Sequence, residues 1–156
     1  MPESARIARQ MVQAFDADAW HGDSVSQVIA SVTATVANAR PIAQAHTIGE
    51  IVLHLIATQR ILLRRLDGDA TAKDMAPEED WPTMADPSEV AWQAAVAELA
   101  SNDRSFRERV AAFPEDRLDL PLIPGGSSAY NNFHGYVQHN LYHLGQIALL
   151  SKAHGV

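Results

Sequence analysis

The chain has 156 residues and a mass of 17.0 kDa, so we expect a single domain over residues 1–156 with a core of its own. The formal charge is -7, with only 12 Lys and Arg, which argues against the basic surface that nucleic-acid binding requires. There is no cysteine, so disulfides and thiolate ligands are excluded. A metal would have to be held by His, Asp, Glu or water.

Nothing in the sequence predicts a membrane segment. The longest apolar runs are interrupted well short of the roughly 20 residues that span a bilayer. The N-terminal stretch MPESARIARQ lacks the apolar centre of a signal peptide. We therefore expect a cytoplasmic protein.

The first predicted element is a helix from Glu3 to about Asp16, in which Ile7, Met11 and Phe15 recur at close to the helical period. Residues 18–23, from Asp18 to Asp23, should form a turn.

A weaker helix should follow the turn. Ser24 can cap this segment together with Gln27, and apolar residues at helical spacing continue to Val36. Its second half is rich in β-branched residues, which lower helix propensity, so we expect a short or frayed helix that ends before Arg40 and Pro41.

The strongest helix signal runs from Thr47 to Leu66. Thr47 and Glu50 have the spacing of a reciprocal capping box, and a broad apolar face follows. Residues 67–87 then form a long connection with three prolines. Such a length indicates a crossover or a segment that covers a site, and residues 78–81 could close over one as a lid.

Two further helices complete the prediction. One opens near Pro87 and ends at Phe113, and the other runs from about Tyr130 to Ala153 after a loop rich in proline and glycine. Four principal helices without a convincing strand indicate an all-α bundle, whose sites are built by side chains that face inward from different helices.

The last helix carries the clearest functional pattern. His139 and His143 are four residues apart, so both imidazoles lie on one face, about 6 Å apart along the helix axis, and can reach one ion. His54 on an earlier amphipathic helix could join them. Alternatively, the pair lies on the surface and His54 is a hydrogen-bonded core histidine. Two neighbouring stripes are predicted, an apolar one of Phe133, Val137, Leu141, Leu144 and Ala148 and a polar one of Tyr136, His139, His143 and Gln146.

Other polar residues each have two interpretations. Glu50 could orient His54, be a fourth ligand or act as a general base, but capping explains it more simply. His21 could reach the bundle mouth or lie on the surface beside a half-buried Trp20. His134 is expected at the edge of a pocket, and His21 and His134 join Glu50 as candidate general bases for hydrolysis. Gln146 and Tyr142 could donate hydrogen bonds to the histidines or only pack.

Four sequence motifs resemble those of one protein family. They are WHG at 20–22, RP at 40–41, HTIGEIVLH at 46–54 and HGYVQHNLYHLGQI at 134–147. In this order they resemble the DinB-like or YfiT-like metal-binding four-helix bundles. The resemblance implies an up-down-down-up bundle that is often a homodimer. It also implies a divalent nickel, zinc or iron ion held by three histidines, which by motif position are His54, His139 and His143.

The function that this resemblance implies is broad. Relatives include thiol-dependent transferases or isomerases that use low-molecular-weight thiols, and proteins described as metal-dependent hydrolases. We therefore expect a metal-dependent enzyme with a small-molecule substrate, in which the ion activates water or a thiol. The competing hypotheses are a non-catalytic metal- or ligand-binding stress-response protein, and a metal-free bundle that works through its dimer surface.

Overall fold

The computed structural model describes residues 1–16 and 19–155, and every regular element within them is helical. The predicted all-α class is therefore confirmed. Asp18 of the predicted turn lies outside the described residues. The elements are α1 (Glu3–Phe15), α2 (Val25–Ala30), α3 (Ala34–Asn38), α4 (Ile48–Leu66), α5 (Pro77–Asp80), α6 (Glu89–Ala111), the 3-10 helix η1 (Glu115–Arg117) and α7 (Ala129–Ala153).

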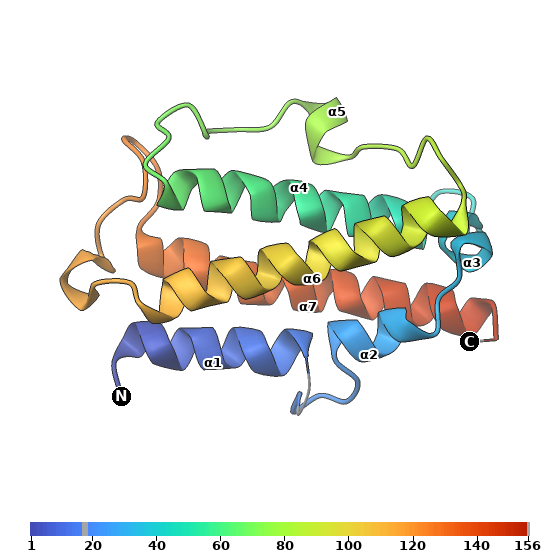
Figure 1. Cartoon of the computed structure of the whole chain (residues 1–156), viewed down its shortest axis with the longest axis horizontal. Coiled ribbons are helices and arrows are strands. Elements are labelled where there is room, and N and C mark those ends of the chain that lie inside the picture. The colour runs from blue at the N-terminus through green and yellow to red at the C-terminus, as the bar shows by residue number, and fades with distance from the viewer. Residues whose placement is uncertain (17–18, 156) are drawn as a thin grey trace.

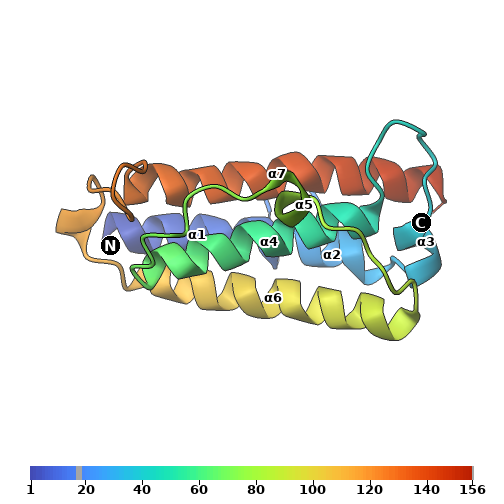
Figure 2. The ribbon, with the colours of Figure 1, turned by 90° about the horizontal axis from the view of Figure 1, so that it is seen from above.

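The long helices α1, α4, α6 and α7 lie side by side (Figure 1). Both α1 and α4 pack on α6 and α7, and α2 continues along α7 beyond the end of α1. The connection between α4 and α6 returns along the outside of α4. Seen from above, α5 in this connection lies between α4 and α7 (Figure 2). None of the described helices has the length and apolarity needed to cross a membrane.

Two apolar clusters fill the space between the helices. The cluster toward α2 and α3 includes Val25, Ile29, Ile51, Leu55, Trp92, Leu99 and Ile147. The cluster toward the other end includes Ile7, Met11, Leu62, Phe106, Val110 and Phe133. Each long helix thus contributes the apolar face that its periodicity predicted.

The predicted start of α4 is confirmed in detail. Thr47 Oγ1 accepts a hydrogen bond from the Glu50 N–H at 3.1 Å, and Glu50 Oε2 accepts one from the Thr47 N–H at 2.8 Å. This capping box satisfies two backbone donors that a helix N-terminus leaves free. It fixes where α4 begins, and hence the depth at which His54 sits.

The weaker helix predicted after Ser24 is wrong as a single element. It is divided into α2 and α3, because Thr33 caps a new start and Glu89 Oε2 accepts from the Ala34 N–H at 2.8 Å. The carbonyl of Val32 is also taken by the indole N–H of Trp92, at 2.7 Å. Side chains of α6, a helix far away in the sequence, therefore supply hydrogen bonds at the end of α2 and at the start of α3.

The predicted apolar stripe of the last helix is only partly buried. Val137, Leu141 and Ala148 are half-buried, whereas the polar stripe contributes Tyr136 and His143 to the buried face of α7. Polar side chains can face inward here because each of these two finds a polar partner on the same or another helix.

A buried polar chain links α4, α6 and α7. Tyr136 Oη donates to Asp103 Oδ1 at 2.7 Å and accepts from Gln59 Nε2 at 3.0 Å. Arg107 Nη1 lies 3.0 Å from Asp103 Oδ2. Burial raises the pKa of Asp103 to about 6, although the Tyr136 hydroxyl and the Arg107 guanidinium oppose this shift.

Removing the central hydroxyl should destabilise the fold. Tyr136→Phe leaves Asp103 Oδ1 without its donor and removes one of the two acceptors of Gln59 Nε2, so we expect the free energy of unfolding to fall by about 1–3 kcal/mol. Tyr142→Phe on the same helix is the matched control, because Tyr142 is 67% exposed and its change should be negligible. Urea unfolding followed by circular dichroism measures both. Equal stability of the two variants would contradict a structural role for the chain.

Candidate metal centre

Three histidines from two helices converge beneath α5. His54 projects from α4, and His139 and His143 project from successive turns of α7. One ring nitrogen of each lies within 4.8 Å of the others, and the His54 and His139 Nε2 atoms are 2.9 Å apart. His54 and His143 are buried and His139 is half-buried. The arrangement is compatible with metal binding.

The tautomer of His54 is set by Asp80, the last residue of α5. His54 Nδ1 lies 2.7 Å from the backbone oxygen of Asp80 and 3.1 Å from its Oδ1. Both oxygens are acceptors, so Nδ1 carries the proton and Nε2 presents its lone pair toward His139. A histidine oriented by a carboxylate in this way is the common form of a metal ligand.

The spacing of the nitrogens fits a small divalent ion. Two imidazole nitrogens that share a tetrahedral ion at about 2.0–2.1 Å are roughly 3.3 Å apart. The observed separations, from 2.9 Å to at most 4.8 Å, bracket that value. In addition, His139 Nδ1 is buried with no hydrogen-bond partner among the described residues, so hydrogen bonding alone does not account for the polar atoms of this ring.

The electrostatics of the centre keep the imidazoles of His139 and His143 neutral. Burial, together with the neighbouring His143 and His54, lowers the pKa of His139 to about 4. Burial and His54 also lower the pKa of His143, against a hydrogen bond with Gln146. The neutral imidazole is the form that binds a metal, so at neutral pH these two rings need to lose no proton.

Trp81 covers the centre. Its ring stacks on His54 at 4.0 Å between centroids with an interplanar angle of 3°, and His46 stacks on its other side at 3.7 Å and 9°. The edge of the same indole meets His143 at 5.8 Å. Residues 78–81, whose role as a lid the sequence left open, thus lie directly over the histidines.

Glu50 is committed elsewhere. Besides capping α4, it accepts a charged hydrogen bond from Arg40 Nη2 at 2.7 Å, and its Oε2 lies 3.4 Å from His46 Nδ1. Burial by itself would raise the pKa of Glu50, but the Thr47 N–H and the Arg40 guanidinium lower it. The structure therefore favours the capping interpretation of Glu50 over that of a ligand or general base.

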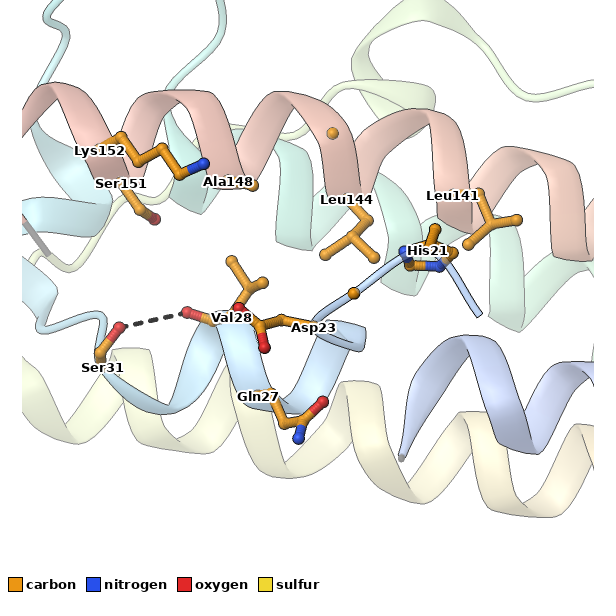
Figure 3. Close-up of a pocket in the computed structure, with 12 residues that line it drawn as sticks. His21, Asp23, Gln27, Val28, Ser31, Leu141, Leu144, Ala148, Ser151 and Lys152 are labelled. Atoms are coloured by element: carbon orange, nitrogen blue, oxygen red, sulfur yellow. Dashed lines mark hydrogen bonds between the residues drawn. The ribbon is translucent and has the colours of Figure 1, made fainter. Parts of the chain in front are cut away.

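His21 lies in a groove on another side of α7. The groove has a volume of about 650 Å³ and runs between α2 and α7, with His21 and Leu141 at one end and Lys152 at the other (Figure 3). At about 100° per residue, Leu141 and Ala148 face roughly opposite His139. His21 is therefore not brought to the metal centre. Its neighbour Trp20 is fully exposed rather than half-buried, which corrects the prediction.

The remaining candidates lie around the centre or away from it. Gln146 Oε1 is 3.3 Å from His143 Nδ1, so Gln146 contacts the ring as predicted but as an acceptor instead of the expected donor. Tyr142 is largely exposed, although its ring edge meets His143 at 5.0 Å. His134 packs on Tyr130 at 4.4 Å and does not belong to the group of three.

The sequence reasoning did not identify the partners of the histidines on the connection. Asp80 is 26 residues from His54, and no spacing rule relates two such positions. The acidic residues 78–80 before Trp81 did not by themselves indicate a contact with the metal centre, because acidic residues in connections are usually solvated. The stacking of His46, the first residue of the HTIGEIVLH motif, on Trp81 was not predicted either.

Comparisons with known proteins agree with this site. A search of curated proteins and a search of solved structures found no significant match. A family model described as the DinB superfamily matches residues 17–147, a range that contains all three histidines of the centre. Because the match covers most of the sequence, the chain belongs to the DinB superfamily.

Proposed function

We propose that the protein is a metal-dependent enzyme whose divalent ion is held by His54, His139 and His143. The observation that carries the proposal is the size of the group: no fourth His, Asp or Glu of the described residues joins the three nitrogens. Three protein ligands are typical of catalytic sites, whereas structural sites close the shell with four. When bound, a nickel, zinc or iron ion would supply a Lewis acid that activates water or a thiol.

Thiol transfer fits the surrounding residues better than hydrolysis does. Hydrolysis calls for a general base near the reacting water. The nearby carboxylates are engaged, since Glu50 pairs with Arg40 and Asp80 accepts from His54. Stabilising a thiolate asks for no such base. We therefore propose a small-molecule substrate with a low-molecular-weight thiol as co-substrate.

A non-catalytic metal-binding role is the second candidate. The stacked Trp81 and the bonded Asp80 cover the centre in the way expected of a closed, structural site. Coordination and turnover separate the two functions, because a structural ion has no exchangeable position and supports no reaction.

We propose the finer features of the family for this chain as well. The chain direction in Figure 1, with α4 and α6 running the same way and joined by residues 67–88, supports an up-down-down-up four-helix bundle with a crossover. A homodimer in the cytoplasm is proposed from the family resemblance.

Removing one ligand should remove the metal. For His143→Ala we expect the metal content to fall from about one ion per chain to below about half, because two imidazoles hold a divalent ion weakly. His154→Ala, which changes a histidine beyond the end of α7, is the control and should retain full occupancy. Elemental analysis of protein purified without added metal measures both. Unchanged content in His143→Ala would count against the three-histidine centre.

Zinc affinity should depend on pH with a definite sign. Protons compete with the metal for imidazoles, so affinity falls as the pH is lowered. A lowered pKa keeps His139 neutral until the pH approaches about 4, and His143 shifts in the same direction. Three imidazoles of ordinary pKa, about 6.5, would together cost about a thousandfold in affinity between pH 7.5 and 5.5, so the loss should stay well below that factor. Calorimetric titration at several pH values tests this, and a loss of about a thousandfold or more would be contrary to the assigned environment.

Turnover should follow the metal. We expect the metal-loaded protein to transfer a low-molecular-weight thiol to an electrophilic acceptor and to hydrolyse activated esters more weakly. We expect His139→Ala to lose both activities. Assays of the zinc, nickel and iron forms with both substrate types measure this. Full metal occupancy with no turnover of any substrate would favour the structural role.

A further inference from the structure

The connection between α4 and α6 is fastened at both ends. Arg65 donates to the carbonyl oxygens of Ala72, at 2.8 Å, and Lys73. Ala72 is itself buried. At the far end, Met84 packs on the apolar core and approaches Gly49, where a Cβ would meet its Cε at 3.4 Å. The middle of the connection therefore has to remain near α4, but neither anchor determines how it lies.

The middle segment of the connection, residues 76–82, makes few stabilising contacts within itself. α5 is a single turn without a buried residue, and its first backbone donor is capped by its own Glu79 at 3.0 Å. Isolated helices of this length are unstable in water. Two of the contacts that dock it on the bundle are made to the metal centre, namely the hydrogen bond between Asp80 and His54 and the stacking of Trp81 on His54.

The same contacts restrain His54 from two directions. Asp80 fixes the ring tautomer through Nδ1, while Trp81 lies flat against the ring face and is backed by His46. The ligand nitrogen of His54 is thus aimed at His139 only while the connection is docked. Removing such an orienting partner typically costs a metal site about 10- to 100-fold in affinity.

We propose that residues 76–82 form a strap whose docking is coupled to occupancy of the metal centre, with Asp80 as a positioning residue for His54 and Trp81 as the cover. The inference rests on the proposed metal function. An ion on Nε2 holds the His54 ring in the orientation that receives Asp80 and Trp81, and the docked strap holds the ring in the orientation that binds the ion. Because coupling between two equilibria is reciprocal, each must strengthen the other by the same factor.

Zinc affinity of strap variants tests one direction of the coupling. We expect Trp81→Ala to bind zinc about 10- to 100-fold more weakly than the wild type in calorimetric titrations, and Asp80→Ala, which keeps the backbone oxygen bonded to His54, to lose less. Trp81→Phe keeps a flat ring and should recover most of the affinity. Asp80→Asn keeps an acceptor and should lose less than Asp80→Ala. The matched control is Glu78→Ala, an exposed acidic residue of the same turn, whose affinity should equal that of the wild type.

Hydrogen exchange tests the other direction. The amides of Glu79, Asp80 and Trp81 donate to the carbonyl oxygens of Ala76 and Pro77, at the start of the α5 turn, so they are protected only when that turn is intact. Zinc should slow their exchange in the wild type and in Glu78→Ala. It should have no effect in His139→Ala, which lacks a ligand.

The outcomes distinguish the two proposals. A wild-type protein that binds no zinc would remove the metal function and the strap with it. Tight zinc binding that is unchanged in Asp80→Ala and Trp81→Ala, with unaltered exchange at residues 79–81, would overturn the coupling and leave the metal function standing. Far-UV circular dichroism of each variant, together with the Trp81→Phe recovery, separates a loss of docking from a loss of fold.

Discussion

The imidazole of His54 is the point at which the three parts of this site meet. One ring nitrogen is bonded to Asp80 on the connection, and the other faces His139 on the last helix. Its backbone belongs to α4, whose register is set by the capping box at Thr47. A ring restrained at both nitrogens has one orientation and one tautomer, and this is what turns nearby histidines into a candidate ligand set. The packing of α4 against α7 would bring the rings close, but it would not aim them.

The last helix serves two polar clusters without exposing either. Tyr136 faces the buried chain with Asp103 and Gln59, and one turn later His139 and His143 face the metal centre. Tyr136 has polar partners on two other helices and His143 has one on α7 itself, which matters because an unpaired polar group in the core is costly. The opposite side of the helix is apolar and lines the groove between α2 and α7. The two sides of one helix are thus specialised, and the apolar side is the less buried of the two.

Membership of the DinB superfamily agrees with the helical fold, whereas the chemistry has to be argued from the site. Three ring nitrogens converge beside carboxylates that already have partners, and burial keeps the His139 and His143 rings neutral, which suits the electrophilic role that we propose. The carboxylates nearest the centre, Glu50 and Asp80, are not free to act as a general base. The cover formed by Trp81 also means that a substrate must approach past the connection or displace it. Access of a substrate to the centre therefore depends on whether the strap is docked.

The features that the sequence determined by itself are local ones. Helix periodicity, the Thr47 capping box and the four-residue spacing of His139 and His143 all depend on residues within a turn or two of each other, so they can be read directly. The tertiary structure alone decided the docking of Asp80 on His54 and the break before α3, because each depends on a hydrogen bond between residues far apart in the chain. Local preferences establish where helices begin and end, but which faces meet is settled only when the whole core packs.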